Sequence, residues 1–118
     1  MSDQEPVLFL VDSTSFDLMR TVTLAGVPKA AQIARYSPDG KILLVTSLQS
    51  ATATLIDATF THQTTLGVGK QPMDAAFHGD ALFVACQGDG SIHVVDLVSR
   101  TMSRRFAAGV DCETLAFF

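Results

Sequence analysis

The 118-residue sequence has no tryptophan, a single tyrosine and only two cysteines, Cys86 and Cys112. Two cysteines are too few for a disulfide scaffold, and neither belongs to a CxxC pair or lies in a His-rich stretch of the kind that binds zinc. Free cysteine is usually packed inside a protein as a small apolar side chain. We therefore expect both thiols to be buried and no metal to be bound through them.

Charged residues and long apolar runs are scarce as well. Charged residues make up 17% of the chain and hydrophobic residues 47%, a balance typical of globular proteins and unlike that of disordered ones. Apolar runs such as Val7–Val11 and Ile42–Val45 have the length of strands and fall far short of the roughly 20 residues that a membrane helix needs. The sequence therefore predicts one globular domain over residues 1–118, with residues 1–6 as a disordered tail and no membrane span.

Basic residues are few and scattered. Eight Lys and Arg stand against twelve Asp and Glu, giving a net charge of −4, and only Arg104 and Arg105 are adjacent. This pattern offers no basic surface for a phosphate backbone, so nucleic acid is not an expected partner. The first six residues carry two acids and no base, unlike the start of a secretory signal. Because a leader can be removed during maturation, the cellular compartment stays open.

What the sequence does contain is a repeat. Leu8-Phe9-Leu10-Val11-Asp12 aligns without gaps with Ala53-Thr54-Leu55-Ile56-Asp57 and with Ile92-His93-Val94-Val95-Asp96, and the three aspartates are 45 and 39 residues apart. After each aspartate a polar turn and a strand lead to a glycine, Gly26, Gly69 or Gly109, at intervals of 14, 12 and 13 residues. A period of about 40–45 residues is typical of the four-stranded blades of a β-propeller.

Further strands and turns recur within the same period. Small apolar strands are expected at Ala31–Tyr36, Pro72–His78 and Cys112–Phe118, and the turn Ser37-Pro38-Asp39-Gly40 leads into another strand at Ile42–Ser47, as His78-Gly79-Asp80 leads into Ala81–Cys86. No window keeps the apolar spacing of a helix. The sequence thus predicts an all-β fold of eleven strands, about 2.75 four-stranded antiparallel propeller blades. A sandwich or barrel is the alternative, but it would not require several features to recur in one order.

The repeats resemble those of the YVTN-type bacterial β-propeller family. The resemblance rests on Leu-Val-Asp-Ser-Thr at 10–14, Leu-Ile-Asp-Ala-Thr at 55–59, Val-Val-Asp-Leu at 94–97, the spacing Gly69-x-x-Pro72, the Ser-Pro-Asp-Gly turn at 37–40 and the strand Leu-Phe-Val-Ala at 82–85. Cys112 departs from the family pattern, because it stands where the family has proline. The resemblance implies two complete blades, from Ala31 to about Leu66 and from Pro72 to about Phe106, with a leading half blade and a trailing strand.

The resemblance also implies a ligand face. In the family, the connections between blades and those between the second and third strands of a blade lie on one face of the propeller. In this sequence the candidate ligand-face residues are Lys70, Gln71, Asp74, Gln87, Asp89, Asp111 and Glu113, and Lys29 and Gln49 lie in the same connections. Asp74, Asp111 and Glu113 could hold a cation or a hydroxylated ligand, although their spacing matches no calcium loop, and ordinary solvated turns would look the same.

Residues that could carry catalysis are not grouped. Asp12, Asp57 and Asp96 recur at strand ends before turn residues, which favours a role as turn caps. His62, His78 and His93 lack metal-binding spacing, and His93 is expected to be a hydrogen-bonded histidine in an apolar strand. No Gly-x-Ser-x-Gly, Walker or dinucleotide-binding glycine pattern occurs. We expect no catalytic, cofactor-binding or metal-binding residue, and no cofactor.

These observations favour a non-enzymatic propeller module that serves as a scaffold or binding platform for a protein partner or a small ligand. The alternative is part of a propeller enzyme, such as a sugar-lactone lactonase or the large subunit of a quinone-dependent amine dehydrogenase. A truncated gene product without an independent role is a third reading. Because eleven strands cannot close a ring, we expect the chain to associate with copies of itself or with the remaining blades of a longer propeller.

Overall fold

The computed structural model describes residues 7–24 and 31–107, and within these ranges the chain forms ten strands and no helix. The strands are β1 (Val7–Val11), β2 (Leu18–Thr23), β3 (Ala31–Tyr36), β4 (Ile42–Ser47), β5 (Thr52–Asp57), β6 (Gln63–Gly67), β7 (Pro72–His78), β8 (Ala81–Cys86), β9 (Ser91–Asp96) and β10 (Thr101–Ala107). In the described ranges there is consequently no helix that could cross a membrane. The strand expected at Cys112–Phe118 and the tail expected at residues 1–6 lie outside the described residues.

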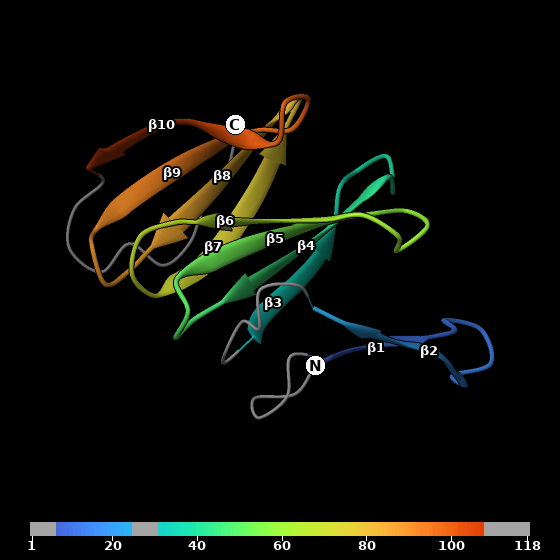
Figure 1. Cartoon of the computed structure of the whole chain (residues 1–118). Helices are drawn as coiled ribbons and strands as arrows, with labels where there is room; N and C mark the ends of the chain where they lie inside the picture. Colours follow the sequence, from blue (N-terminus) through green and yellow to red (C-terminus); the bar gives the residue numbers. More distant parts are fainter. Residues whose placement is uncertain (1–6, 25–30, 108–118) are drawn as a thin grey trace.

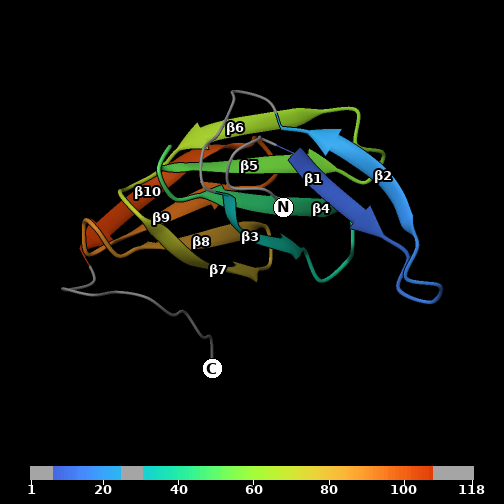
Figure 2. The same cartoon turned by 90° about the horizontal axis from the view of Figure 1, so that it is seen from below.

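The strands form three antiparallel sheets, each a meander in sequence order. The hairpin β1–β2 is a two-stranded sheet, β3 to β6 form one four-stranded sheet, and β7 to β10 form another (Figure 1). The predicted blade boundaries are confirmed, because the first two strands of both complete blades have the bounds expected from the repeat. Seen from below, β3 and β7 lie side by side at one edge of the two blades (Figure 2).

The blades pack face to face because their middle strands are apolar on both sides. In β4, Leu44 points into a core shared with the following blade, whereas Leu43 and Val45 point into a core shared with β1 and β2. This alternation is the period-2 geometry of a strand, and a strand buried on both faces reads as a continuous apolar run. Burial of a leucine side chain stabilises a fold by about 1.5–3 kcal/mol, so β4 and β5 hold their blade to the sheets on both sides.

The larger core lies between the sheet of β3 to β6 and the sheet of β7 to β10. Its buried members are Leu44, Ala53, Leu55, Ala75, Leu82, Val84, Cys86 and Val95. The Cys86 thiol forms no disulfide among the described residues and is fully buried among these side chains, which confirms its expected role as a small apolar residue. Cys112 lies outside the described residues.

The repeat aspartates cap their turns, as predicted. One carboxylate oxygen of Asp12 accepts hydrogen bonds from the backbone N–H groups of Thr14, at 2.8 Å, and Ser15, at 2.9 Å. Asp96 does the same for the two turn residues Val98 and Ser99. Asp57 accepts four hydrogen bonds, from the hydroxyls of Thr59 and Thr61 and from the N–H groups of Thr61 and His62. The hydrogen bond from the Thr59 hydroxyl has the largest effect and that from the His62 N–H the next largest, and together they hold the pKa of the Asp57 carboxyl well below its usual range.

Candidate functional site

Part of the predicted ligand face lies in the β6–β7 connection and the β8–β9 turn, which are joined by hydrogen bonds. The N–H of Gln87 donates to the carbonyl of Gln71 at 2.9 Å, and the N–H of Gly88 donates to the carbonyl of Lys70 at 3.0 Å. The carboxylate of Asp89 accepts a hydrogen bond from the N–H of Lys70 at 2.8 Å. Four of the predicted residues, Lys70, Gln71, Gln87 and Asp89, therefore belong to one connected pair of turns.

The other predicted ligand-face residues lie on other elements or outside the described residues. Asp74 lies on β7, where its carboxylate forms an ion pair with the guanidinium of Arg35 on β3, at 3.2 Å. The Arg35 guanidinium also donates to the carbonyl of Ala75, so this pair links the first strands of two successive blades. Gln49 is an exposed turn residue between β4 and β5. Asp111, Glu113 and Lys29 lie outside the described residues.

A polar cluster lies directly beneath the tied turns. His93 is 5% exposed, and its Nε2 lies 3.1 Å from the hydroxyl oxygen of Ser91, so the expected hydrogen-bonded histidine is confirmed. Burial lowers the pKa of His93 below its ordinary value of 6.5, and the Arg105 guanidinium adds to this effect while the Asp89 carboxylate opposes it. The proximity of Ser91 and His93 could have been predicted from the sequence, because residues two apart on a strand share a face.

Gly69 covers this cluster. A Cβ atom on Gly69 would lie 2.6 Å from an Asp89 carboxylate oxygen and 2.8 Å from both His93 Nε2 and the Ser91 hydroxyl oxygen. The backbone of the β6–β7 connection thus lies against the Ser91–His93 pair, and any larger residue at position 69 would force these side chains to shift. An open polar pocket of about 580 Å³ lies beside the cluster and is lined by Asp89, Ser91, Arg105, Phe106 and Ala107.

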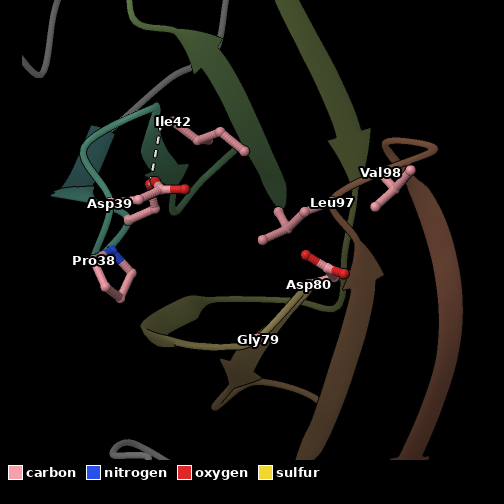
Figure 3. Close-up of a pocket in the computed structure, with 8 residues that line it drawn as sticks. Pro38, Asp39, Ile42, Gly79, Asp80, Leu97 and Val98 are labelled. Atoms are coloured by element: carbon pink, nitrogen blue, oxygen red, sulfur yellow. Dashed lines mark hydrogen bonds between the residues drawn. The ribbon is translucent and has the colours of Figure 1, made fainter.

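A second pocket lies on the opposite face, where the chain turns from β3 to β4 and from β7 to β8. We call it the blade-junction pocket, and it has a volume of about 300 Å³. Figure 3 shows its residues converging from the two complete blades. They are Ser37, Pro38, Asp39, Ile42, Gly79, Asp80, Leu97 and Val98. Reading the sequence for a ligand face missed this pocket, because its walls come from turns of two different blades.

The blade-junction pocket is held in shape by local hydrogen bonds. The Ser37 hydroxyl accepts from the N–H of Ile42 at 3.1 Å and donates to the Asp39 carboxylate at 2.7 Å. On the other wall, the N–H of Leu97 donates to the carbonyl of Asp80 at 2.9 Å. The pocket therefore has an apolar floor of Ile42, Leu97 and Val98 between two acidic turns, a shape and polarity suited to binding.

Comparison with known proteins supports the fold. No protein-family model and no curated protein matches the sequence. Among solved structures, the periplasmic gluconolactonase of Pseudomonas aeruginosa matches with a TM-score of 0.74 and 19% identity over 97% of this chain and 37% of that one. AztD of Citrobacter koseri, without ligand, matches with a TM-score of 0.72 and 17% identity over 92% of this chain and 31% of that one. Both are β-propeller proteins.

The chain is an arc of a β-propeller. The hydrazine synthase of Kuenenia stuttgartiensis agrees, with a TM-score of 0.71 and 23% identity over 85% of this chain and 29% of that one. The chain spans about a third of the length of these propellers. Identities this low show the fold alone, since propellers host many unrelated functions. The YVTN-type repeat stays a prediction from the sequence.

Proposed function

We propose that this propeller arc is a non-enzymatic binding platform for a protein partner or a small ligand. The observation that carries the proposal is the blade-junction pocket, an apolar concavity with acidic turns whose walls both come from complete blades. Ligand pockets commonly combine an apolar lining with a few polar groups that fix orientation. The turns that form it are joined to rigid strands, which is the usual way in which loops on a scaffold carry binding.

Chemical-shift mapping tests this proposal. The ¹⁵N-labelled chain is titrated with amino-acid amides, short peptides, monosaccharides and aldonolactones, and the amide signals of both blades are followed. We expect saturable shifts confined to the blade-junction pocket or to the predicted ligand face around Asp89. If none of these compounds moves signals at either place up to millimolar concentration, the binding-platform proposal is wrong.

A propeller lactonase is the second candidate. It is favoured by the likeness to the periplasmic gluconolactonase and to a structure described as a putative 6-phosphogluconolactonase from Bacteroides fragilis, with a TM-score of 0.67 and 20% identity over 96% of this chain and 35% of that one. Hydrolysis of gluconolactone, followed by the acid released at constant pH, decides between the two. Turnover well above the buffer rate would favour the lactonase, and its absence beside pocket binding would favour the platform.

The open edge of β1 supports a further part of the proposal, that the chain is completed by copies of itself or by remaining propeller blades. β5 and β9, which repeat the motif of β1, pair on both edges, whereas β1 pairs only with β2 among the described residues. On β1 itself, Phe9 and Val11 are 46% and 54% exposed, and both line an apolar pocket of about 300 Å³. An unpaired apolar strand edge is a site for pairing with another strand.

A further inference from the structure

The two acids of the blade-junction pocket have carboxylate oxygens to spare. Asp39 uses the same oxygen, Oδ1, to accept from the Ser37 hydroxyl and from the N–H of Lys41, so its Oδ2 accepts no hydrogen bond from a described residue. The Asp80 carboxylate likewise accepts none from the described part of the chain. Figure 3 shows the two carboxylates on facing walls. No Lys, Arg or His is among the described residues that line the pocket.

The floor between these carboxylates is apolar. Ile42, Leu97 and Val98 form it, and Val98 is 77% exposed although its side chain is aliphatic. An apolar floor beneath two acids matches a side chain with a long methylene chain and a positive end, since lysine and arginine place their stems on apolar surface and their charges at its rim. A volume of about 300 Å³ lies at the lower end of ligand pockets, which suits a single long side chain.

The surface continues beyond this pocket along one blade. A second pocket, of about 280 Å³, shares Asp80 and Val98 with the first and extends past Asp96 to Ser103 on β10. A ligand that occupied both pockets would be elongated, as an extended peptide is. The second pocket adds a third acid, Asp96, and the whole chain has a net charge of −4.

We propose that the blade-junction pocket receives an arginine or lysine side chain from an extended segment of a protein partner. This inference rests on the proposed binding-platform function and names its ligand. The methylene stem packs on Ile42, Leu97 and Val98, and the charged end meets the carboxylates of Asp80 and Asp39. Arginine fits better than lysine, because a planar guanidinium can donate to two carboxylates at once.

The test uses the ¹⁵N-labelled chain and four blocked peptides of sequence Gly-Ser-X-Ser-Gly, with arginine, lysine, citrulline or norleucine at X. We expect the arginine peptide to shift the amide signals of Gly79, Asp80, Leu97 and Val98. Citrulline has the shape of arginine without its charge, so its peptide should bind about two- to five-fold more weakly, as befits exposed ion pairs. The difference should shrink in 0.5 M NaCl, because salt screens such pairs.

Two variants and a control locate the effect. Asp80→Asn should weaken the arginine peptide about two- to five-fold and reduce its advantage over the citrulline peptide. Val98→Ser should weaken the arginine and norleucine peptides alike, since it removes part of the apolar floor. Both positions are exposed, so both variants should fold. Asp17→Asn, at an exposed turn of the β1–β2 hairpin, changes the net charge equally and should leave binding unchanged.

The outcomes separate this inference from the proposed function. Equal binding of the arginine, citrulline and norleucine peptides at these signals would overturn the cationic ligand while leaving the pocket as a binding site. Arginine amide binding as tightly as the arginine peptide would overturn the assignment to a protein segment. If no peptide shifts these signals, the inference is wrong, and the platform proposal then depends on the other compounds of its own titration.

Discussion

Gly69→Ala is the substitution whose effect the structure specifies best. The added methyl would lie 2.6–2.8 Å from three polar atoms, of Asp89, Ser91 and His93, closer than such atoms approach one another. None of them can move away freely, because Asp89 holds the N–H of Lys70 and the buried His93 is hydrogen-bonded to Ser91. Forcing an extra methyl into a packed site typically costs about 1–3 kcal/mol.

Part of this cost is offset in the unfolded chain, where alanine has fewer conformations than glycine, an effect of about 0.4–1 kcal/mol. The net loss in the free energy of unfolding should be roughly 1–2 kcal/mol, which lowers Tm by several degrees in a domain of this size. Urea unfolding at one fixed protein concentration measures it. In the double variant with Ser91→Ala the two losses should be less than additive, because the substitutions relieve a shared contact.

Gly67→Ala is the matched control. Gly67 lies in the same connection at the end of β6, but nothing lies within 4 Å of the Cβ that it would carry. This variant should be as stable as the natural chain or slightly more so. If Gly69→Ala proves as stable as Gly67→Ala, the close packing of the β6–β7 connection on the Ser91–His93 pair is wrong.

Three further predictions concern pH, the turn caps and the open edge. Because the pKa of His93 is lowered, its contribution to stability is complete above pH 6.5 and is lost as the pH falls below 6.5. His93→Gln should therefore reduce the loss of unfolding free energy below pH 6.5, measured by urea unfolding, with His78→Gln as the control. An unchanged pH dependence in His93→Gln would contradict the burial of His93. Asp57→Ala should lower Tm more than Asp96→Ala, because four hydrogen bonds are lost rather than two, and the reverse order would refute this reasoning. Val11→Lys should reduce self-association in sedimentation experiments, because lysine protects an exposed strand edge, whereas no effect would remove β1 as the associating edge.

The strands and turn caps were predictable because their causes are local. A strand buried on both faces is a short apolar run, and β3, β4, β7 and β8 have the expected bounds. The caps follow from aspartate at a strand end. Each turn after a repeat aspartate contains a residue with left-handed backbone: Phe16, Phe60 and Arg100, at φ of 63°, 59° and 58°. These conformations were not predictable, because none of the three residues is a glycine.

The candidate sites depend on distances between blades, which the repeat pattern does not contain. Asp39 and Asp80 belong to successive blades, and only the packing of the two sheets decides that their turns enclose a pocket. The ion pair between Arg35 and Asp74 is similar, since it crosses from β3 to β7. Asp74 is also a predicted ligand-face residue, and its pairing with an arginine of the preceding blade was not predictable from the repeat.

We propose that this propeller arc pairs with further strands at the edge of β1 that is unpaired among the described residues. Light scattering of the purified chain at micromolar concentration tests it most directly. We expect a mass above the 12.6 kDa of one chain, or aggregation of the isolated chain, with the Val11→Lys variant shifted toward the monomer. A stable, non-aggregating monomer of 12.6 kDa would contradict it.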